Sequence, residues 1–508
     1  MNTKSAFLLT LLLALLLACQ ASESPAERVV TPPPTEPQPR PTALDPFALL
    51  WDDRGVFRSG LISSQQDILK QLPGASVYHI DLELAENLLE LTAYQEVRYT
   101  NQEPGALSDI RFRLFPNILG GSLGIESVEV DGDAVSPSFD PLCSAMQVPL
   151  PTPLPPGEQL VIATAFSLTV PAQGEGNYGM FGLEKGVLAL AHFFPIIPAY
   201  DSAGWHVEIP PQHGDLLYAD VAFFTVTVQA PESVTVVASG AEIGRTVLRN
   251  AQRVIYAAGP VRDFYLVASE RYERISQTIG ETVVNSYAPP ERVAGAREAL
   301  GHAIAALEVF GERFGPYPFT ELDLVSTATS AYGIEYPGII ALAERLYGPN
   351  SEYPPAYLES TVAHEVSHQW FYSVVGNDQQ AEPWLDEALA QYSTLAYYDE
   401  LYGPAAADGF RSSLLERWHR VDDAPIPIGL PVSDYTSKEY GAIVYGRGPL
   451  FLEALADIMG ETTFEAFLRD YYVEHAWDVA TFSSFQELAE EHCACELDAL
   501  LDEWVEPR

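Results

Sequence analysis

The residues best suited to chemistry form the run His364-Glu365-Val366-Ser367-His368. Two histidines four positions apart lie on one face of a helix, so their ring nitrogens can bind one metal ion at about 2.0–2.1 Å. Glu365 lies between them and can accept a proton from a water molecule whose pKa a zinc ion lowers towards about 7. The pattern therefore predicts a zinc site that activates water.

A third protein ligand is still needed, and Glu387 is the candidate. Eighteen residues, 369–386, separate it from His368. Pro383 indicates the first position of a second helix, which would carry Glu387. Two histidines and one glutamate leave a coordination position open, as in catalytic zinc sites. The sequence therefore predicts one zinc ion per chain, held by His364, His368 and Glu387.

Chance alone produces the two-histidine pattern in roughly one or two chains of this histidine content per hundred. The flanks make coincidence less plausible, because apolar residues recur every fourth position from Val362 to Val374. Ser360 or Thr361 is suited to cap the start of such a helix. We therefore interpret the run as a zinc-binding helix.

The run and the phrase Trp384-Leu385-Asp386-Glu387-Ala388 resemble the aminopeptidase N and leukotriene-hydrolase family of zinc metallopeptidases. Residues 331–338, Ala-Tyr-Gly-Ile-Glu-Tyr-Pro-Gly, resemble the G-x-M-E-N element of that family. Residues 444–450, Val-Tyr-Gly-Arg-Gly-Pro-Leu, are similar to its Tyr-x-Lys-Gly stretch, and residues 110–117 look like part of its opening β-domain. The resemblance spans about residues 75–508.

The resemblance implies a zinc-dependent aminopeptidase that hydrolyses the N-terminal bond of peptide substrates. Glu365 would be the general base, and Tyr445 would donate a hydrogen bond to the tetrahedral oxyanion, with Tyr440 a weaker companion. Glu335 would pair with the free α-amino group of the substrate. Zinc is the one cofactor implied.

This sequence departs from the family pattern at three positions. Tyr332 stands where the first glycine of G-x-M-E-N is usual, Arg447 replaces a lysine, and Ala388 replaces a glycine. These departures put substrate preference in question. A thermolysin-type endopeptidase remains the enzymatic alternative, and a non-catalytic, surface-tethered peptide-binding protein is the alternative outside enzymes. The presence of both Glu365 and Tyr445 favours catalysis.

The chain is strongly acidic, with 70 acidic and 27 basic residues and a formal net charge of −43. Nucleic acids and anionic membrane surfaces need clustered basic residues, so the charge argues against both as partners. A solvated acidic exterior is the simplest interpretation. Its field would also attract the cationic amino termini of peptides.

The first residues predict export. Residues 1–18 form a signal peptide, and Leu16-Leu17-Ala18-Cys19 resembles the lipobox of bacterial lipoproteins, in which Cys19 is lipidated. Residues 19–46 continue as a proline-rich linker. We expect an extracytoplasmic lipoprotein of the cell envelope, attached to the membrane by its lipid alone. Ordinary secretion and an uncleaved anchor are the alternatives.

Beyond the linker, hydrophobic periodicity predicts an α+β multidomain fold. Tyr78, Ile80, Leu82 and Leu84 alternate with polar residues, as in half-buried strands, and residues 47–285 are predicted to form an antiparallel, saddle-like or sandwich β-domain. Helical spacing dominates later, so residues 286–508 are predicted to be mainly helical. This half resembles a thermolysin-like zinc catalytic domain.

Three cysteines remain after Cys19: Cys143, Cys493 and Cys495. They are too few for a disulfide framework and lack the further ligands of a metal site. We expect buried or loop cysteines, with room for one bridge in an oxidising envelope.

Overall fold

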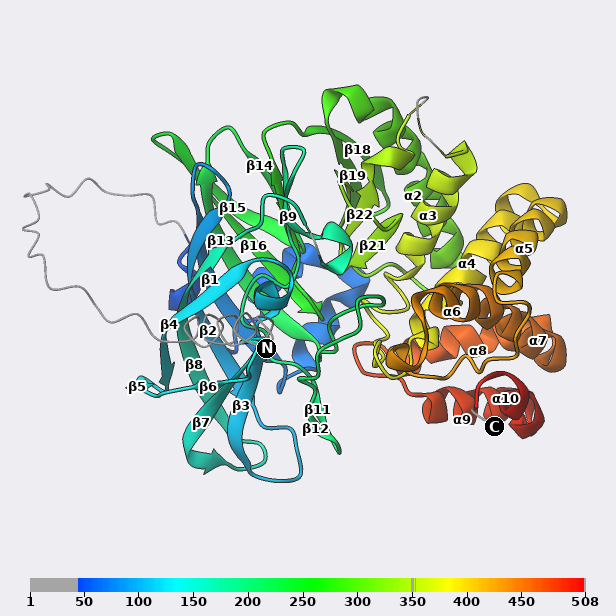
Figure 1. Cartoon of the computed structure of the whole chain (residues 1–508), viewed down its shortest axis with the longest axis horizontal. Helices are drawn as coiled ribbons and strands as arrows, with labels where there is room; N and C mark the ends of the chain where they lie inside the picture. The colour runs from blue at the N-terminus through cyan, green and yellow to red at the C-terminus, as the bar shows by residue number, and fades with distance from the viewer. Residues whose placement is uncertain (1–43, 175, 349–350, 352, 507–508) are drawn as a thin grey trace, which may run out of the picture.

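The computed structural model describes residues 44–174, 176–348, 351 and 353–506. It has a half rich in strands and a half rich in helices (Figure 1). This arrangement confirms the predicted α+β fold, with an N-terminal β-domain followed by a mainly helical domain. The predicted signal peptide, Cys19 and nearly all of the predicted linker lie outside the described residues.

The largest sheet has the strand order β15-β16-β13-β1-β2-β8-β4-β5. Its strands are β1 (Ser76–Leu84), β2 (Glu90–Thr100), β4 (Ser122–Val130), β5 (Asp133–Ala134), β8 (Gln159–Thr169), β13 (Ala222–Pro231), β15 (Ala241–Leu248) and β16 (Ala251–Val261). The apolar residues that alternate along β1 are buried, as the sequence predicts. β1 pairs antiparallel with β2 but parallel with β13, so this largely antiparallel sheet contains one parallel pair.

Three smaller sheets complete the β-rich half. They contain β3 (Leu107–Arg113), β7 (Ala145–Leu154) and β6 (Ser138–Phe139); β14 (Thr235–Ala238), β17 (Leu266–Ser269), β10 (Val187–Leu190) and β9 (Phe181–Glu184); and β11 (Tyr200–Asp201) with β12 (Gly204–Trp205).

The helical half begins with a five-stranded sheet in the order β18-β19-β20-β22-β21. Its strands are β18 (Glu273–Ile279), β19 (Thr282–Ala288), β20 (Glu321–Thr327), β21 (Gly333–Tyr336) and β22 (Ile339–Ala343). The central strands β19, β20 and β22 are parallel, and β18 and β21 pair antiparallel at the edges. The sheet therefore starts upstream of residue 286, where the sequence places the domain boundary.

The first helix, α2 (Val293–Arg313), lies between β19 and β20 along the chain, and the others follow the sheet. These are α3 (Pro355–Ser367), α4 (Trp384–Tyr402), α5 (Pro404–His419), α6 (Ser437–Ala442), a π-helix (Ile443–Arg447), α7 (Gly448–Met459), α8 (Glu461–Glu474), α9 (Phe482–Cys493) and α10 (Asp498–Trp504). None of the described helices is long and apolar enough to cross a membrane.

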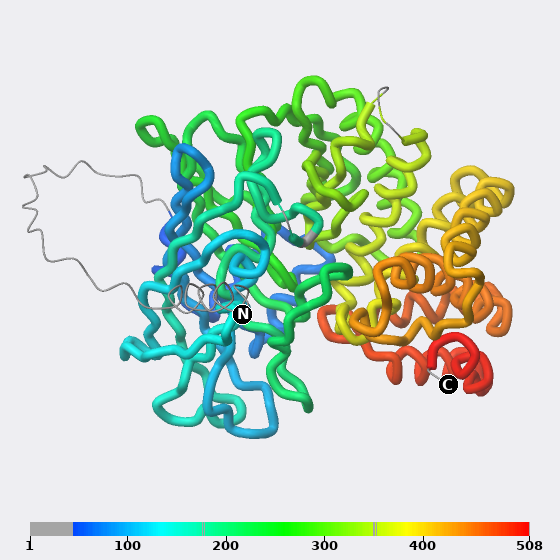
Figure 2. Tube along the Cα trace, viewed as in Figure 1, coloured from blue at the N-terminus to red at the C-terminus, as the bar shows by residue number. Residues whose placement is uncertain are grey.

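The two halves pack tightly against each other (Figure 2). Buried Arg262, which follows β16, donates hydrogen bonds to the carbonyl oxygens of Tyr372 and Val374 at 3.1 and 3.3 Å. The rings of Tyr265 and Tyr336 stack at 4.1 Å across the same boundary. The β-rich half is thereby fixed against β21 and the segment that follows α3, which carry predicted site residues.

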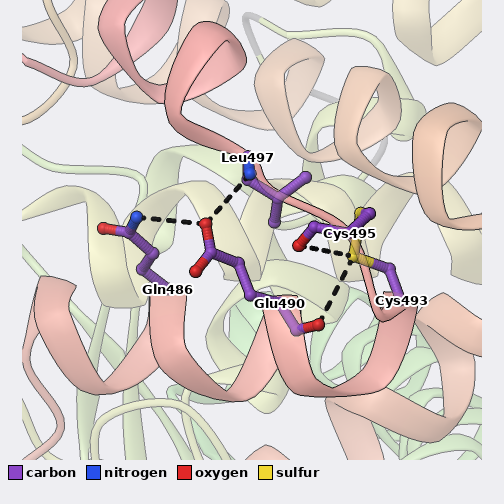
Figure 3. The surroundings of a disulfide bond; sticks show 5 residues. All are labelled: Gln486, Glu490, Cys493, Cys495 and Leu497. Atoms are coloured by element: carbon purple, nitrogen blue, oxygen red, sulfur yellow. Dashed lines mark hydrogen bonds between the residues drawn. A yellow bond between two sulfur atoms is a disulfide. The ribbon is translucent and has the colours of Figure 1, made fainter.

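Cys493, at the end of α9, forms a disulfide with Cys495 (Figure 3). Glu490 Oε1 accepts hydrogen bonds from the backbone N–H of Leu497 at 2.9 Å and from Gln486 Nε2 at 3.2 Å. The turn between α9 and α10 is thus closed by a covalent bond and by hydrogen bonds. The disulfide bond thus joins the last residue of α9 to a cysteine of the loop that follows it.

Candidate metal centre and active site

The three predicted zinc ligands lie together. The Nε2 atoms of His364 and His368 are 3.3 Å apart, and Glu387 Oε2 is 3.1 Å from the first and 3.4 Å from the second. Ligands at about 2.0–2.1 Å from a tetrahedral zinc ion are separated by about 3.4 Å. The triangle therefore has the size that zinc requires.

The ring of His368 is oriented for metal binding. Its Nδ1 lies 3.0 Å from the carbonyl oxygen of Phe371, which can only accept a hydrogen bond. Nδ1 therefore carries the proton, and the Nε2 lone pair faces the other ligands. Glu387 Oε2 is buried without a hydrogen-bond donor in the part of the chain that the structure describes. These residues fit a zinc ion.

The ligands come from the ends of two helices. α3 begins at Pro355, with proline in its first turn, so Ser360 and Thr361 lie inside the helix and the predicted cap was wrong. α4 begins at Trp384, and Pro383 occupies the position just before it. Glu387 is therefore in the first turn of α4, where the helix dipole favours a carboxylate.

Four buried carboxyl groups meet at this centre: Glu335, Glu365, Asp386 and Glu387. Burial, assisted by the charge of Glu387, raises the pKa of Glu335 to about 7 and that of Asp386 to about 8. Burial also raises the pKa of Glu365 well above its usual value. Across the described ranges, no lysine or arginine forms an ion pair with any of the four. The centre is therefore suited to binding cations.

Glu387 behaves differently from the other three. Burial raises its pKa, but its close contacts with His364 and His368 outweigh burial and hold the pKa well below the usual value. It is therefore the carboxyl group of the four that stays ionised most readily, as a metal ligand must.

Glu365 is held against strand β21. A Cβ atom at Gly333 would lie 2.4 Å from Glu365 Oε1, so glycine is required for this contact. Glu335, two residues further along β21, faces the same space. Carboxylate oxygens of Glu335 and Glu365 and a ring nitrogen of His368 all lie within 4.8 Å of one another. β21 therefore brings a second carboxylate beside the predicted general base, at the His368 end of the metal centre.

Tyr445 lies beside Glu387 and His364, two of the three proposed ligands. Its hydroxyl donates a hydrogen bond to Glu387, and its ring centre is 5.9 Å from that of His364. The π-helix provides the wide turn that carries it, as such turns often do at functional sites. The ring centre of Tyr440 lies 5.5 Å from that of Tyr445, and the buried hydroxyl of Tyr440 has no partner among the described residues.

Two departures from the family pattern have structural explanations. Arg447 donates hydrogen bonds to the carbonyl oxygens of Ile426, Glu503 and Trp504 at 2.6–3.1 Å, so it holds the end of α10. A Cβ atom at position 448, where the chain has glycine, would lie 2.7 Å from the Cβ of Ala388. Gly448 therefore makes the room that Ala388 needs.

Several residues near the centre carried no sequence signal. Gln379 donates a hydrogen bond at 2.8 Å to Asp386 Oδ2. Burial and the charges of Glu335 and Glu387 raise the pKa of Asp215, which comes from a loop of the β-rich half. Both residues lie outside periodic segments and motifs. Asp386 could have been suspected from the sequence only because it directly precedes Glu387.

Comparison with known proteins places these residues in a family context. Residues 298–504 match the model of the Peptidase family M1 domain. Aminopeptidase M1-B of Oryza sativa subsp. japonica is 24% identical over 302 residues, which cover 56% of this chain and 34% of the relative. Aminopeptidase 2 of Candida albicans is 24% identical over 298 residues, covering 56% of this chain and 32% of the relative. The match thus spans about a third of the length of these relatives.

Solved structures extend the likeness to both halves. The M1 zinc metallopeptidase from Deinococcus radiodurans has a TM-score of 0.63 at 21% identity, covering 85% of this chain and 94% of that chain. A mutant of that protein bound to a Tyr-Ser-Ala substrate has a TM-score of 0.64 at the same identity and coverage. This likeness shows that the whole two-part fold is shared.

Proposed function

Because residues 298–504 match the model of the Peptidase family M1 domain, we propose that the protein is a zinc-dependent aminopeptidase that hydrolyses the N-terminal bond of peptides. The observation that carries the proposal is the position of Glu335, a buried carboxylate within 4.8 Å of Glu365 and His368. A carboxylate there offers a charge-assisted partner to a substrate ammonium group next to the reacting bond. Such an anchor makes an enzyme act at the amino end.

One zinc ion per chain would be held by His364, His368 and Glu387. It would supply Lewis acidity that activates water and polarises the scissile carbonyl. Glu365 would take the proton from the attacking water and pass it to the leaving amine. Tyr445 would leave Glu387 and donate its hydrogen bond to the developing oxyanion.

Peptide substrates are supported by the relatives named as aminopeptidases and by the neighbour bound to Tyr-Ser-Ala. The test is hydrolysis of a series of aminoacyl fluorogenic substrates before and after a chelator, followed by zinc. We expect turnover that the chelator abolishes and zinc restores. Cleavage of internal bonds only, with no release of N-terminal residues, would reject the aminopeptidase and favour the thermolysin-type endopeptidase.

We also propose that the enzyme is a lipoprotein of the bacterial cell envelope, attached through Cys19. The support is the apolar run that ends at Leu16-Leu17-Ala18-Cys19 and the proline-rich segment after it. Cys19→Ser should appear in the soluble fraction, whereas the parent should stay with membranes. A mutant that remains in the membrane fraction would point to an uncleaved helix instead.

A further inference from the structure

Arg417 lies on α5 beside the proposed active site. Its guanidinium carbon is 5.9 Å from the ring centre of Tyr445. Figure 1 shows α5 next to α4, the helix that carries Glu387. α5 can approach the π-helix this closely because residue 446 is glycine. A Cβ atom there would lie 3.0 Å from both the Leu414 carbonyl oxygen and the Cβ of Arg417.

No carboxylate or hydrogen-bond acceptor among the described residues engages the Arg417 guanidinium; its recorded contact is the ring of Tyr445. Arg345, the other arginine beside this region, is fully engaged, because it donates hydrogen bonds to the carbonyl oxygens of residues 329, 330 and 331. Arg417 is half-buried, and its partial burial lowers the pKa of the guanidinium. A half-buried guanidinium without an acceptor is available to bind an anion.

The direction of α3 places Arg417 at the end of the site opposite Glu335. Glu335 is grouped with His368, at the C-terminal end of α3. Tyr357 precedes His364 by two helical turns, or about 10.5 Å along the axis. Arg417 is electrostatically coupled to Tyr357 and to His364. A substrate with its ammonium at Glu335 and its scissile bond at the metal would therefore direct its leaving part towards Arg417.

An aromatic cluster of Tyr332, Tyr353 and Tyr357 borders this end of the site. The three ring centres lie 5.4–5.7 Å apart, and the side chains of Tyr332 and Tyr357 are partly exposed. Tyr332 directly precedes Gly333, against which Glu365 packs. The arginine over these rings is Arg345, whose guanidinium carbon lies 5.4 Å from the ring centre of Tyr332 and 5.9 Å from that of Tyr353. Tyr332 and Tyr357 also interact electrostatically with Arg417, so the unusual tyrosine of the motif lies on the same side of the site.

We propose that Arg417 binds the free α-carboxylate of short peptide substrates, on the leaving side of the scissile bond. Each extended residue of a peptide adds about 3.3–3.6 Å. The Arg417 guanidinium, 5.9 Å from the ring centre of Tyr445, is therefore within reach of a carboxylate one or two residues beyond the scissile carbonyl. This inference rests on the proposed aminopeptidase function and narrows its substrates to dipeptides and tripeptides. In a chain of net charge −43, Arg417 would offset the general repulsion of anionic peptide ends.

The experiment compares kcat/KM for Leu-Ala and Leu-Ala-Ala with kcat/KM for the same peptides carrying a C-terminal amide. The parent should favour the free acids, and Arg417→Gln should reduce the acid-to-amide ratio about ten- to a hundredfold. Arg420→Gln is the matched control, because Arg420 is the exposed residue that directly follows α5. It should keep the parent ratio. Zinc content is measured in every variant.

A parent that cleaves acids and amides equally would overturn this inference while leaving the aminopeptidase intact; a parent that cleaves neither would remove the aminopeptidase itself. Equal losses on acids and amides in Arg417→Gln would show a structural role and also overturn the inference. Leu-Asp-amide and Leu-Asn-amide separate the two sources of a carboxylate. A preference confined to Leu-Asp-amide would assign Arg417 to acidic side chains and reject the α-carboxylate.

Discussion

The hydroxyl of Tyr445 donates a hydrogen bond to the carboxylate of Glu387, so the proposed oxyanion donor contacts the proposed third zinc ligand directly. The contact holds the phenol beside the metal centre before substrate arrives. Burial and the charge of Glu387 also raise the pKa of Tyr445 well above its usual value, so the phenol keeps the proton that it must donate.

Tyr445→Phe should lower kcat by about 10²- to 10³-fold with little change in KM, because the lost hydrogen bond is made mainly in the transition state. Steady-state kinetics on an aminoacyl fluorogenic substrate measures this. Tyr440→Phe is the comparison, since the Tyr440 ring packs against Tyr445 while the Tyr445 hydroxyl contacts Glu387. An unchanged kcat in Tyr445→Phe would assign the oxyanion role elsewhere.

His364→Ala should lose the zinc ion, because two remaining ligands cannot complete the site. Elemental analysis of purified protein should find one zinc per chain in the parent and close to none in the variant. His419→Ala serves as the control, since His419 is exposed at the end of α5. Equal zinc in the parent and in His364→Ala would contradict the ligand assignment.

Glu365→Gln should keep its zinc and lose nearly all turnover, because an amide cannot accept the proton of the attacking water. Zinc content and kcat are measured on the same preparation. Loss of zinc together with activity would instead show that Glu365 supports the structure of the site.

Glu335→Ala should lose about ten- to a hundredfold in kcat/KM on peptides with a free amino terminus, the value of a charge-assisted hydrogen bond of roughly 1.5–3 kcal/mol. Zinc content should not change. Amino-acetylated peptides should be poor substrates of both proteins, because they offer no ammonium. Comparable cleavage of free and acetylated peptides by the parent would argue for an endopeptidase, and Tyr332 would be the first residue to examine.

Acid should destabilise the fold through His79, which is buried and stacks on Trp51 at 4.3 Å. Burial and the nearby arginines lower its pKa to about 4, compared with about 6.5 when unfolded. The unfolded chain therefore binds more protons between these values, and stability is lost as the pH falls from about 6.5 towards 4.

His79→Phe keeps the ring and removes the titration. Urea unfolding at pH 7 and pH 4.5 should show the parent losing roughly 2–3 kcal/mol more than the variant over this interval. Equal losses in the two proteins would mean that His79 is not the source of the acid sensitivity.

Local spacing is enough to bring His364 and His368 together. Two histidines four residues apart need only one turn of helix to face the same way, and the apolar alternation along β1 sets its buried face without help from the rest of the fold. Helix ends were less predictable. The apolar spacing suggests a helix that continues to Val374, but α3 ends at Ser367. Trp370 and Val374 are buried in the non-helical segment that follows.

Residues that join the site from distant segments could not be predicted. Asp215, Gln379 and Arg417 reach it through tertiary packing, and no periodicity marks them. The parallel pairing of β1 with β13 joins residues 76 and 222 and depends on a long crossover. The pairing of β19 with β20 likewise draws residues 273–288 into the sheet of the helical half.

The π-helix contacts both the proposed metal centre and the last helix, α10. Tyr445 contacts a proposed zinc ligand, and two residues later Arg447 grips the carbonyl oxygens at the end of α10. Trimming or tagging the chain at Glu503 would therefore release the arginine that braces this turn. Changes near the carboxyl terminus are therefore expected to affect the proposed active site through Arg447.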